Sequence, residues 1–268
     1  MDTPPPQGSQ RESLDAYARF AARLTDGAGA ILREHFRRPV AVERKADGSP
    51  VTAADRAAEA AMRALITAQY PAHGVIGEEG GAERPAARYV WVLDPIDGTQ
   101  AFMTGKPSFG TLIALLEDGK PVLGVIDQPI TGERWLGRRG QGTTLNGTAA
   151  GTRDCAAPAS AALYATTPHM FGGAAAAAFE RLRSEVALTR YGADCYAYGL
   201  LASGFVDLVV EASLQPYDYC ALVPVVEGAG GVMTDWEGRA LGLESDGRVV
   251  AAGTPALHGA ALAILGGG

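Results

Sequence analysis

The sequence has few cysteines and no long apolar segment. Its three cysteines, Cys155, Cys195 and Cys220, cannot all pair with one another, and none belongs to a C-x-x-C motif or a Cys/His cluster. No stretch approaches the ~18 uninterrupted apolar residues of a transmembrane helix. The opening MDTPPPQGSQ lacks the basic and apolar regions of a signal peptide. We therefore expect a protein of the reducing cytoplasm that does not contact a membrane.

Basic residues are outnumbered by acidic ones. The chain has 23 Lys and Arg against 30 Asp and Glu, a net charge of −7, so it is not expected to bind nucleic acid nonspecifically. The excess carboxylates could bind cations or simply keep the surface soluble, and composition leaves both open. With 47% hydrophobic residues in 268, the chain can bury a sizeable core, which excludes a disordered protein or a disulfide-stapled miniprotein.

Glycine and proline are frequent, at 35 and 16 residues, which disfavours an all-helical fold. Apolar residues at three- and four-residue steps predict a helix over about 13–37, and an N-cap at Thr52 predicts a second helix to about residue 69. Short apolar runs predict strands at 74–77, 89–93, 109–116, 122–126 and 134–136. Asp118-Gly119 lies between two of these runs and predicts a β-hairpin. Further strands and helices alternate beyond residue 155, including a helix over 218–227, so we predict a layered α/β protein.

Acidic residues end several of the predicted strands. Glu78 lies in VIGEEGG, Asp94 and Asp97 lie in WVLDPIDGT, and Asp218 lies in LQPYDYCAL. A strand that ends in a carboxylate delivers it to a defined point. We therefore expect these carboxylates to form a site.

The segment D-P-I-D-G-T combines metal ligands with a place for an anion. Pro95 fixes φ and would let the chain reverse, so that both aspartates and the Ile96 carbonyl converge on one cation. Gly98 and Thr99 would open a helical turn, whose N–H groups bind phosphate. Oxygen ligands without Cys or His indicate Mg²⁺, and the combination indicates phosphoryl transfer to water. As an isolated pentapeptide, D-P-x-D-G is also an ordinary turn.

The order of these motifs resembles the inositol monophosphatase superfamily. Its signatures GEE, DPIDGT and WDxAA followed by an EAGG-like element are matched by GEEGG, WVLDPIDGTQAF and SLQPYDYCALVPVVEGAGG. The segment from Lys45 through Asp47, Ser49 and Thr52 to Asp55 matches the family's N-terminal loop and helix start. The resemblance covers about residues 13–265. It implies a five-layered αβαβα sandwich and a homodimer.

The resemblance also implies roles for individual residues. Thr99, hydrogen-bonded to Asp55, would orient the attacking water, although Asp55 could instead be only a helix-dipole partner. The implied ligands of two or three Mg²⁺ ions are Glu78, Asp94, the Ile96 carbonyl, Asp97 and Asp218. The catalytic set is Thr99, Asp55 and Glu78. The predicted substrate-binding set is Asp97, Gly98, Thr99, Arg190, Asp194, Glu211 and Asp218.

Within the superfamily, the segments over 109–137 and 192–218 most resemble histidinol-phosphate phosphatases. Tyr217 replaces the Trp of inositol-cleaving members, and Cys220-Ala221 replaces their usual small-residue pair. The substrate expected from this resemblance is L-histidinol phosphate, whose ammonium would meet Asp194 and Glu211. Open alternatives are an inositol phosphate, a sugar bisphosphate or a 3′-phosphoadenosine nucleotide, and a non-catalytic interaction module. Asp194 could instead cap the following helix, and Glu211 could be a surface charge.

The expected organisation has three parts. Residues 1–10 are predicted to be disordered, 11–154 to form an N-terminal α+β subdomain with the metal site, and 155–268 to form a C-terminal α/β subdomain that closes the active site. Trp91, Trp135 and Trp236 are expected in the core. His73 and His258, each beside a turn glycine, are expected at the surface.

Overall fold

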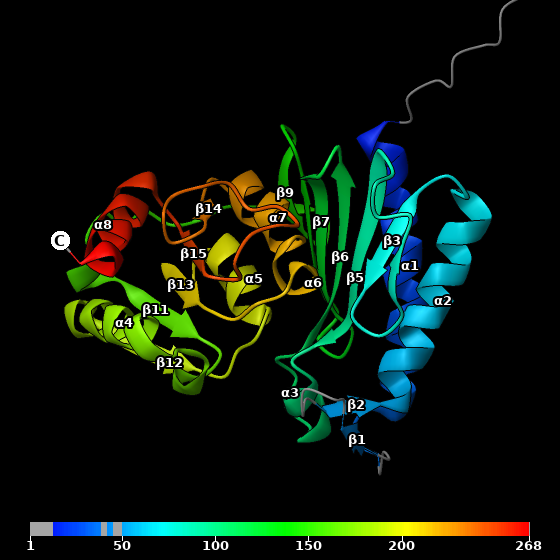
Figure 1. The fold of residues 1–268 in the computed structure, drawn as a ribbon, viewed down its shortest axis with the longest axis horizontal. Coiled ribbons are helices and arrows are strands. Elements are labelled where there is room, and N and C mark those ends of the chain that lie inside the picture. The colour runs from blue at the N-terminus through cyan, green and yellow to red at the C-terminus, as the bar shows by residue number, and fades with distance from the viewer. Residues whose placement is uncertain (1–12, 39–41, 45–49, 268) are drawn as a thin grey trace, which may run out of the picture.

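The computed structural model describes residues 13–38, 42–44 and 50–267 (Figure 1). Lys45, Asp47 and Ser49 of the predicted N-terminal loop, and the predicted disorder of residues 1–10, lie outside the described residues. The helices are α1 Leu14–His35, α2 Ala53–Gln69, α3 Thr99–Met103, α4 Gly173–Glu185, α5 Tyr196–Ala202, α6 Pro216–Tyr219, α7 Leu222–Gly228 and α8 Pro255–Gly266. None of them combines the length and apolarity that a membrane crossing requires.

Two β-sheets dominate the described residues. The eight-stranded sheet has the order β10-β9-β8-β7-β6-β5-β3-β4, and the five-stranded sheet has the order β12-β11-β13-β15-β14. The first contains β3 Gly74–Gly77, β4 Gly81–Glu83, β5 Tyr89–Asp97, β6 Gly110–Glu117, β7 Lys120–Gln128, β8 Glu133–Arg138, β9 Gly142–Leu145 and β10 Thr148–Ala150. The second contains β11 Ala162–Ala165, β12 Leu188–Tyr191, β13 Leu208–Glu211, β14 Val232–Thr234 and β15 Val249–Ala252. A separate ribbon pairs β1 Val42–Arg44 with β2 Pro50–Thr52.

The layers alternate as the resemblance implies. Figure 1 shows α1 and α2 on the outer face of the eight-stranded sheet, α5, α6 and α7 between the two sheets, and α4 and α8 beyond the five-stranded sheet. Three apolar clusters fill the spaces between these layers. Burial between layers is the main stabilising contribution to such a fold. The predicted five-layered αβαβα sandwich is confirmed.

Most predicted elements are present, and local chemistry explains their boundaries. The capping box that begins α2 joins Thr52 and Asp55. The predicted hairpin joins β6 to β7 through Asp118 and Gly119, both with positive φ, as a type I′ turn requires. The strands β9 and β10 were not predicted, although Asn146-Gly147 between them is the same turn signal as Asp118-Gly119.

The helix predicted over 218–227 is interrupted, because the structure has two short helices there, separated by Cys220 and Ala221. Pro224 has no N–H to donate to the carbonyl of residue 220, which favours a break at this point. The connection between α6 and α7 lies directly on the large sheet. A methyl group at Gly124 would overlap the Ala221 carbonyl oxygen, and one at Gly137 would overlap that of Pro224. These two glycines therefore bring the segment after Asp218 against the sheet.

His73 and His258 were predicted to lie at the surface, but this prediction is wrong. His258 is 7% exposed and lies 2.9 Å from the Thr234 hydroxyl. His73 is half-buried, stacks on Tyr70 and accepts a hydrogen bond from the Trp91 indole. The tryptophans are buried as expected.

Candidate metal centre and active site

A β-bulge near the end of β5 brings two aspartates to one side of the strand. In a regular strand, residues three positions apart point to opposite faces. Here Asp94 pairs with Leu112 and Asp97 with Gly110, so β5 contains one extra residue between the two pairs. The predicted chain reversal at Pro95 is wrong. The strand continues to Asp97, and the bulge accommodates a proline that cannot donate to the ladder.

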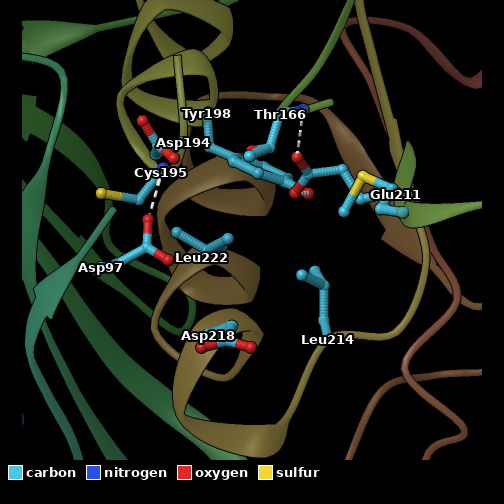
Figure 2. Close-up of a pocket in the computed structure, with 10 residues that line it drawn as sticks. Asp97, Thr166, Asp194, Cys195, Tyr198, Glu211, Leu214, Asp218 and Leu222 are labelled. Atoms are coloured by element: carbon cyan, nitrogen blue, oxygen red, sulfur yellow. Dashed lines mark hydrogen bonds between the residues drawn. The ribbon is translucent and has the colours of Figure 1, made fainter. Parts of the chain in front are cut away.

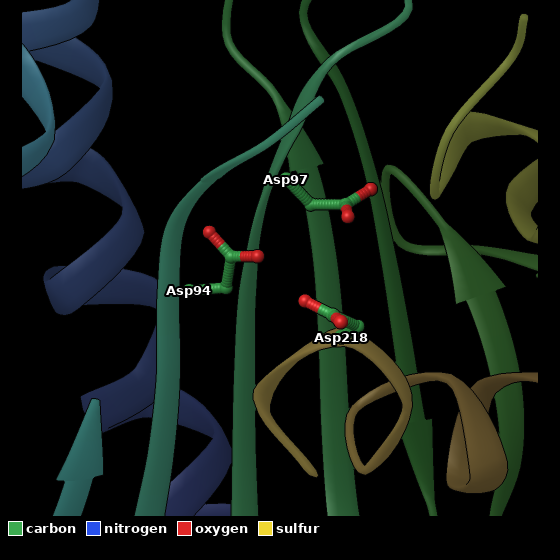
Figure 3. A group of neighbouring side chains, drawn as sticks. All are labelled: Asp94, Asp97 and Asp218. Carbon is green, nitrogen blue, oxygen red and sulfur yellow. The ribbon is translucent and has the colours of Figure 1, made fainter. Parts of the chain in front are cut away.

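The third aspartate comes from the layer between the sheets. Asp218 lies in the first turn of α6, where its carboxylate accepts a hydrogen bond from the Gln215 N–H at 2.7 Å. One carboxylate oxygen each of Asp94, Asp97 and Asp218 lies within 4.8 Å of the other two. Figure 3 shows the three side chains pointing toward one another. We call these three residues the acidic cluster.

Burial and mutual repulsion both act on the acidic cluster. Burial is the main reason why the pKa of Asp94 lies well above its usual value, with the charges of Glu78, Asp97 and Asp218 adding to the effect. Burial raises the pKa of Asp97 in the same way and that of Asp218 to about 7. Such carboxylates are stabilised as anions by a nearby cation. An all-oxygen donor set of this kind fits Mg²⁺.

Glu78 lies beside the acidic cluster. It follows β3, which runs parallel to β5 with Gly77 opposite Leu93, so Glu78 and Asp94 follow matched positions on neighbouring strands. Its N–H donates to the Leu93 carbonyl at 3.2 Å. Its charge contributes to the raised pKa values of Asp94, Asp218 and Asp55. The structure therefore brings this predicted ligand to the same region.

Thr99 and Asp55 face each other across the start of α3. The Thr99 hydroxyl lies 3.5 Å from Asp55 Oδ1 and 3.1 Å from the Ile96 carbonyl oxygen. Asp55 Oδ2 accepts hydrogen bonds from the N–H and the hydroxyl of Thr52 at 2.8 and 2.6 Å. Asp55 is therefore a helix-capping residue through one oxygen and a neighbour of Thr99 through the other. Gly98 caps α3 with φ 86°.

A cavity of about 100 Å³ adjoins the acidic cluster (Figure 2). Its lining includes the predicted residues Asp97, Asp194, Glu211 and Asp218. The other lining residues were not predicted from the sequence; they are Thr166, Met170, Cys195, Tyr198, Leu214 and Leu222. Thr166 follows β11, and the carboxyl ends of parallel strands are a usual place for ligand sites. This signal was available in the sequence.

Asp194 lies in the loop between β12 and α5. Its φ is 49°, and its side chain accepts a hydrogen bond from the Ser108 hydroxyl at 3.2 Å. A Cβ at Gly98 would lie 2.8 Å from Asp194 Cγ, so the loop packs against the start of α3. The N–H of Cys195 donates to Asp97 at 2.6 Å. Because Cys195 occupies the N-cap of α5, the alternative in which Asp194 caps that helix is wrong.

Glu211 and Arg190 differ in their placement. Glu211 ends β13 and is 3% exposed, so it is not a surface charge. Arg190 is exposed on the edge strand β12 and does not line the cavity. The predicted substrate-binding set is therefore brought together without Arg190.

A model described as the inositol monophosphatase family matches residues 13–266. The chain belongs to the inositol monophosphatase family. Enzymes of this family are metal-dependent phosphatases, which agrees with the presence of the acidic cluster. Four predicted ligands thus lie on or directly after strands of the eight-stranded sheet, and the helices between the sheets and the end of β13 contribute to the cavity.

Relatives of this family member differ in their named activities. The chain is 51% identical over 258 residues to the chloroplastic bifunctional phosphatase IMPL2 of Arabidopsis thaliana, covering 93% of this chain and 75% of that protein. It is 36% identical over 234 residues to a histidinol-phosphatase of Chlorobaculum parvum, covering 87% and 90%. An inositol monophosphatase structure from Zymomonas mobilis matches with a TM-score of 0.88 and 50% identity, covering 96% and 100%.

The raised pKa of Asp218 predicts how the stability of the metal-free protein depends on pH. Asp218 has a folded-state pKa of about 7 against about 3.9 when unfolded. The folded state therefore binds the proton more tightly, and the resulting stability is lost as pH rises through about 7. We expect the melting temperature in chelator to fall between about pH 5 and about pH 8, and less so in Asp218→Asn. An equal fall in both proteins would contradict this assignment.

Proposed function

We propose that this phosphatase is Mg²⁺-dependent and hydrolyses L-histidinol phosphate to L-histidinol and phosphate. The main support for the proposal is that two groups of carboxylates line one cavity: members of the acidic cluster, and the pair Asp194 and Glu211. The acidic cluster suits cations that bind a phosphate dianion. Asp194 and Glu211 line the same cavity and suit an ammonium group. Histidinol phosphate presents both charges on one small molecule.

The proposed roles follow from the contacts of each residue. Glu78, the acidic cluster and the Ile96 carbonyl would hold two or three Mg²⁺ ions. When bound, Mg²⁺ would withdraw charge from the phosphate oxygens and acidify water. The N–H groups of Gly98 and Thr99, at the start of α3, would donate to the phosphate. Thr99 would hold the attacking water and pass its proton toward Asp55, 3.5 Å from the Thr99 hydroxyl.

The choice of substrate has support from the relatives and from the cavity. Proteins named histidinol-phosphatase from Chlorobaculum parvum and Mycobacterium tuberculosis are 36% and 35% identical to this chain. Burial raises the pKa values of Glu211 and Asp194, so both carboxylates gain from a cationic group in the cavity, which a ligand without the ammonium does not supply. A second candidate substrate is an inositol phosphate, which the Zymomonas mobilis structure favours. Tyr217 and Cys220-Ala221 depart from the inositol-cleaving pattern and weigh against it.

Phosphate release separates the alternatives. Rates on histidinol phosphate, inositol 1-phosphate and fructose 1,6-bisphosphate would identify the substrate class, and a 3′-phosphoadenosine nucleotide completes the panel. No release with any metal would favour the non-catalytic interaction module. The homodimer, the cytoplasmic location and the subdomain division at 154/155 stay predictions.

Thr99 and Asp55 are expected to act as one catalytic unit. Thr99→Ala and Asp55→Asn should each lower kcat by a factor on the order of 10²–10⁴, the usual range for general acid–base catalysis. The double variant should lose little more than either single variant, because one proton transfer needs both groups. Steady-state kinetics at saturating Mg²⁺ measures this. Losses that multiply in the double variant would show that the two residues act separately.

The ammonium subsite predicts a substrate-dependent loss. Glu211→Gln and Asp194→Asn should each lower kcat/KM for histidinol phosphate by roughly tenfold or more, about 1.4 kcal/mol. Hydrolysis of glycerol 2-phosphate, which has no ammonium, should fall much less. Glu185→Gln, at the exposed end of α4, is the matched control and should change neither rate. Equal losses on both substrates would mean that Glu211 and Asp194 serve the metals or the fold.

A further inference from the structure

Three separate elements fix the orientation of Glu211. Glu211 ends β13, and its Oε1 accepts a hydrogen bond at 2.8 Å from the N–H of Thr166, which follows the parallel strand β11. Its Oε2 accepts a hydrogen bond at 2.8 Å from the hydroxyl of Tyr198 on α5. Figure 2 shows Tyr198 and Thr166 next to Glu211 at one end of the cavity. The carboxylate is therefore held from both oxygens.

The Tyr198 hydroxyl remains protonated and keeps donating its hydrogen bond to Glu211. Tyr198 is 0% exposed, and burial raises the pKa of its phenol well above the usual value, so the hydroxyl stays a donor. A carboxylate oxygen has two acceptor positions. Each Glu211 oxygen therefore keeps capacity for a further donor after these bonds. The two bonds also keep the side chain from turning toward the acidic cluster.

We propose that Tyr198 is a positioning residue that sets the preference of this enzyme for phosphate monoesters bearing an ammonium group. It acts through Glu211, whose carboxylate it aims at the cavity. This inference rests on the proposed function, because it needs an ammonium-bearing substrate. It predicts that one buried hydroxyl, which makes its hydrogen bond to Glu211, changes substrate preference without changing phosphate hydrolysis itself.

A merely structural role makes a different prediction. If the hydroxyl only satisfies a buried carboxylate, Tyr198→Phe lowers the melting temperature and leaves the ratio of kcat/KM values for two substrates unchanged. If the hydroxyl positions Glu211, the ratio of kcat/KM for histidinol phosphate to that for glycerol 2-phosphate falls. The ratio is therefore the decisive readout, because loss of active protein affects both substrates equally.

The experiment compares Tyr198→Phe, Glu211→Gln, the double variant and a matched control. Tyr196→Phe is the control, since Tyr196 lies on the same helix and donates to Glu133 at 2.7 Å, outside the cavity lining. We expect Tyr198→Phe to lower the ratio at least about fivefold, the effect of losing one ordinary hydrogen bond. The double variant should resemble Glu211→Gln, and Tyr196→Phe should keep the wild-type ratio.

The outcomes separate the two hypotheses. A wild-type enzyme with no preference for histidinol phosphate over glycerol 2-phosphate would overturn the proposed function, and this inference with it. A wild-type preference that Glu211→Gln removes and Tyr198→Phe leaves intact would overturn this inference alone. A fall in the ratio for Tyr196→Phe as large as that for Tyr198→Phe would also overturn it, because α5 rather than the cavity hydroxyl would then be responsible.

Discussion

The rest of the site depends on the electrostatic repulsion among the carboxylates of Asp94, Asp97 and Asp218. Three buried groups of one charge within 4.8 Å of one another are unfavourable as anions. Backbone geometry nevertheless forces them together, through the bulge in β5 and the capping box of α6. Because a bound cation would offset this repulsion, the acidic cluster is suited to bind cations.

Close backbone contacts between layers make this arrangement possible. Gly124 and Gly137 have no side chains, so the carbonyls of Ala221 and Pro224 reach the sheet itself. The segment that follows Asp218 is thereby set against β7 and β8, which lie two and three strands away from β5 in the sheet. On the other side, Gly98 leaves room for Asp194. Small residues at layer contacts thus determine the distance between the acidic cluster and the cavity carboxylates.

The sequence predicted those parts of the site that depend on local pattern. Strand-ending Glu78 and the D-P-I-D segment were recognisable because each carboxylate follows an apolar run, and Thr52 was recognisable as a cap. The bulge was not predicted, since it depends on pairing between β5 and β6 rather than on Pro95 alone. Tyr198 was missed for a similar reason. Its hydroxyl meets Glu211 only through the packing of α5 on β13, and a buried tyrosine in an apolar helix indicates only core.

We propose that the carboxylates of the acidic cluster hold the Mg²⁺ that hydrolysis needs. The most direct test measures phosphate release from histidinol phosphate against Mg²⁺ concentration for the wild type and Asp94→Asn, with both shown to be folded by circular dichroism. The amide oxygen of asparagine carries no charge and binds Mg²⁺ far more weakly than a carboxylate. We predict saturable activation of the wild type and almost no release by Asp94→Asn. Near-normal kcat for Asp94→Asn at ordinary Mg²⁺, or full wild-type activity in chelator, would show that the acidic cluster does not hold a catalytic Mg²⁺.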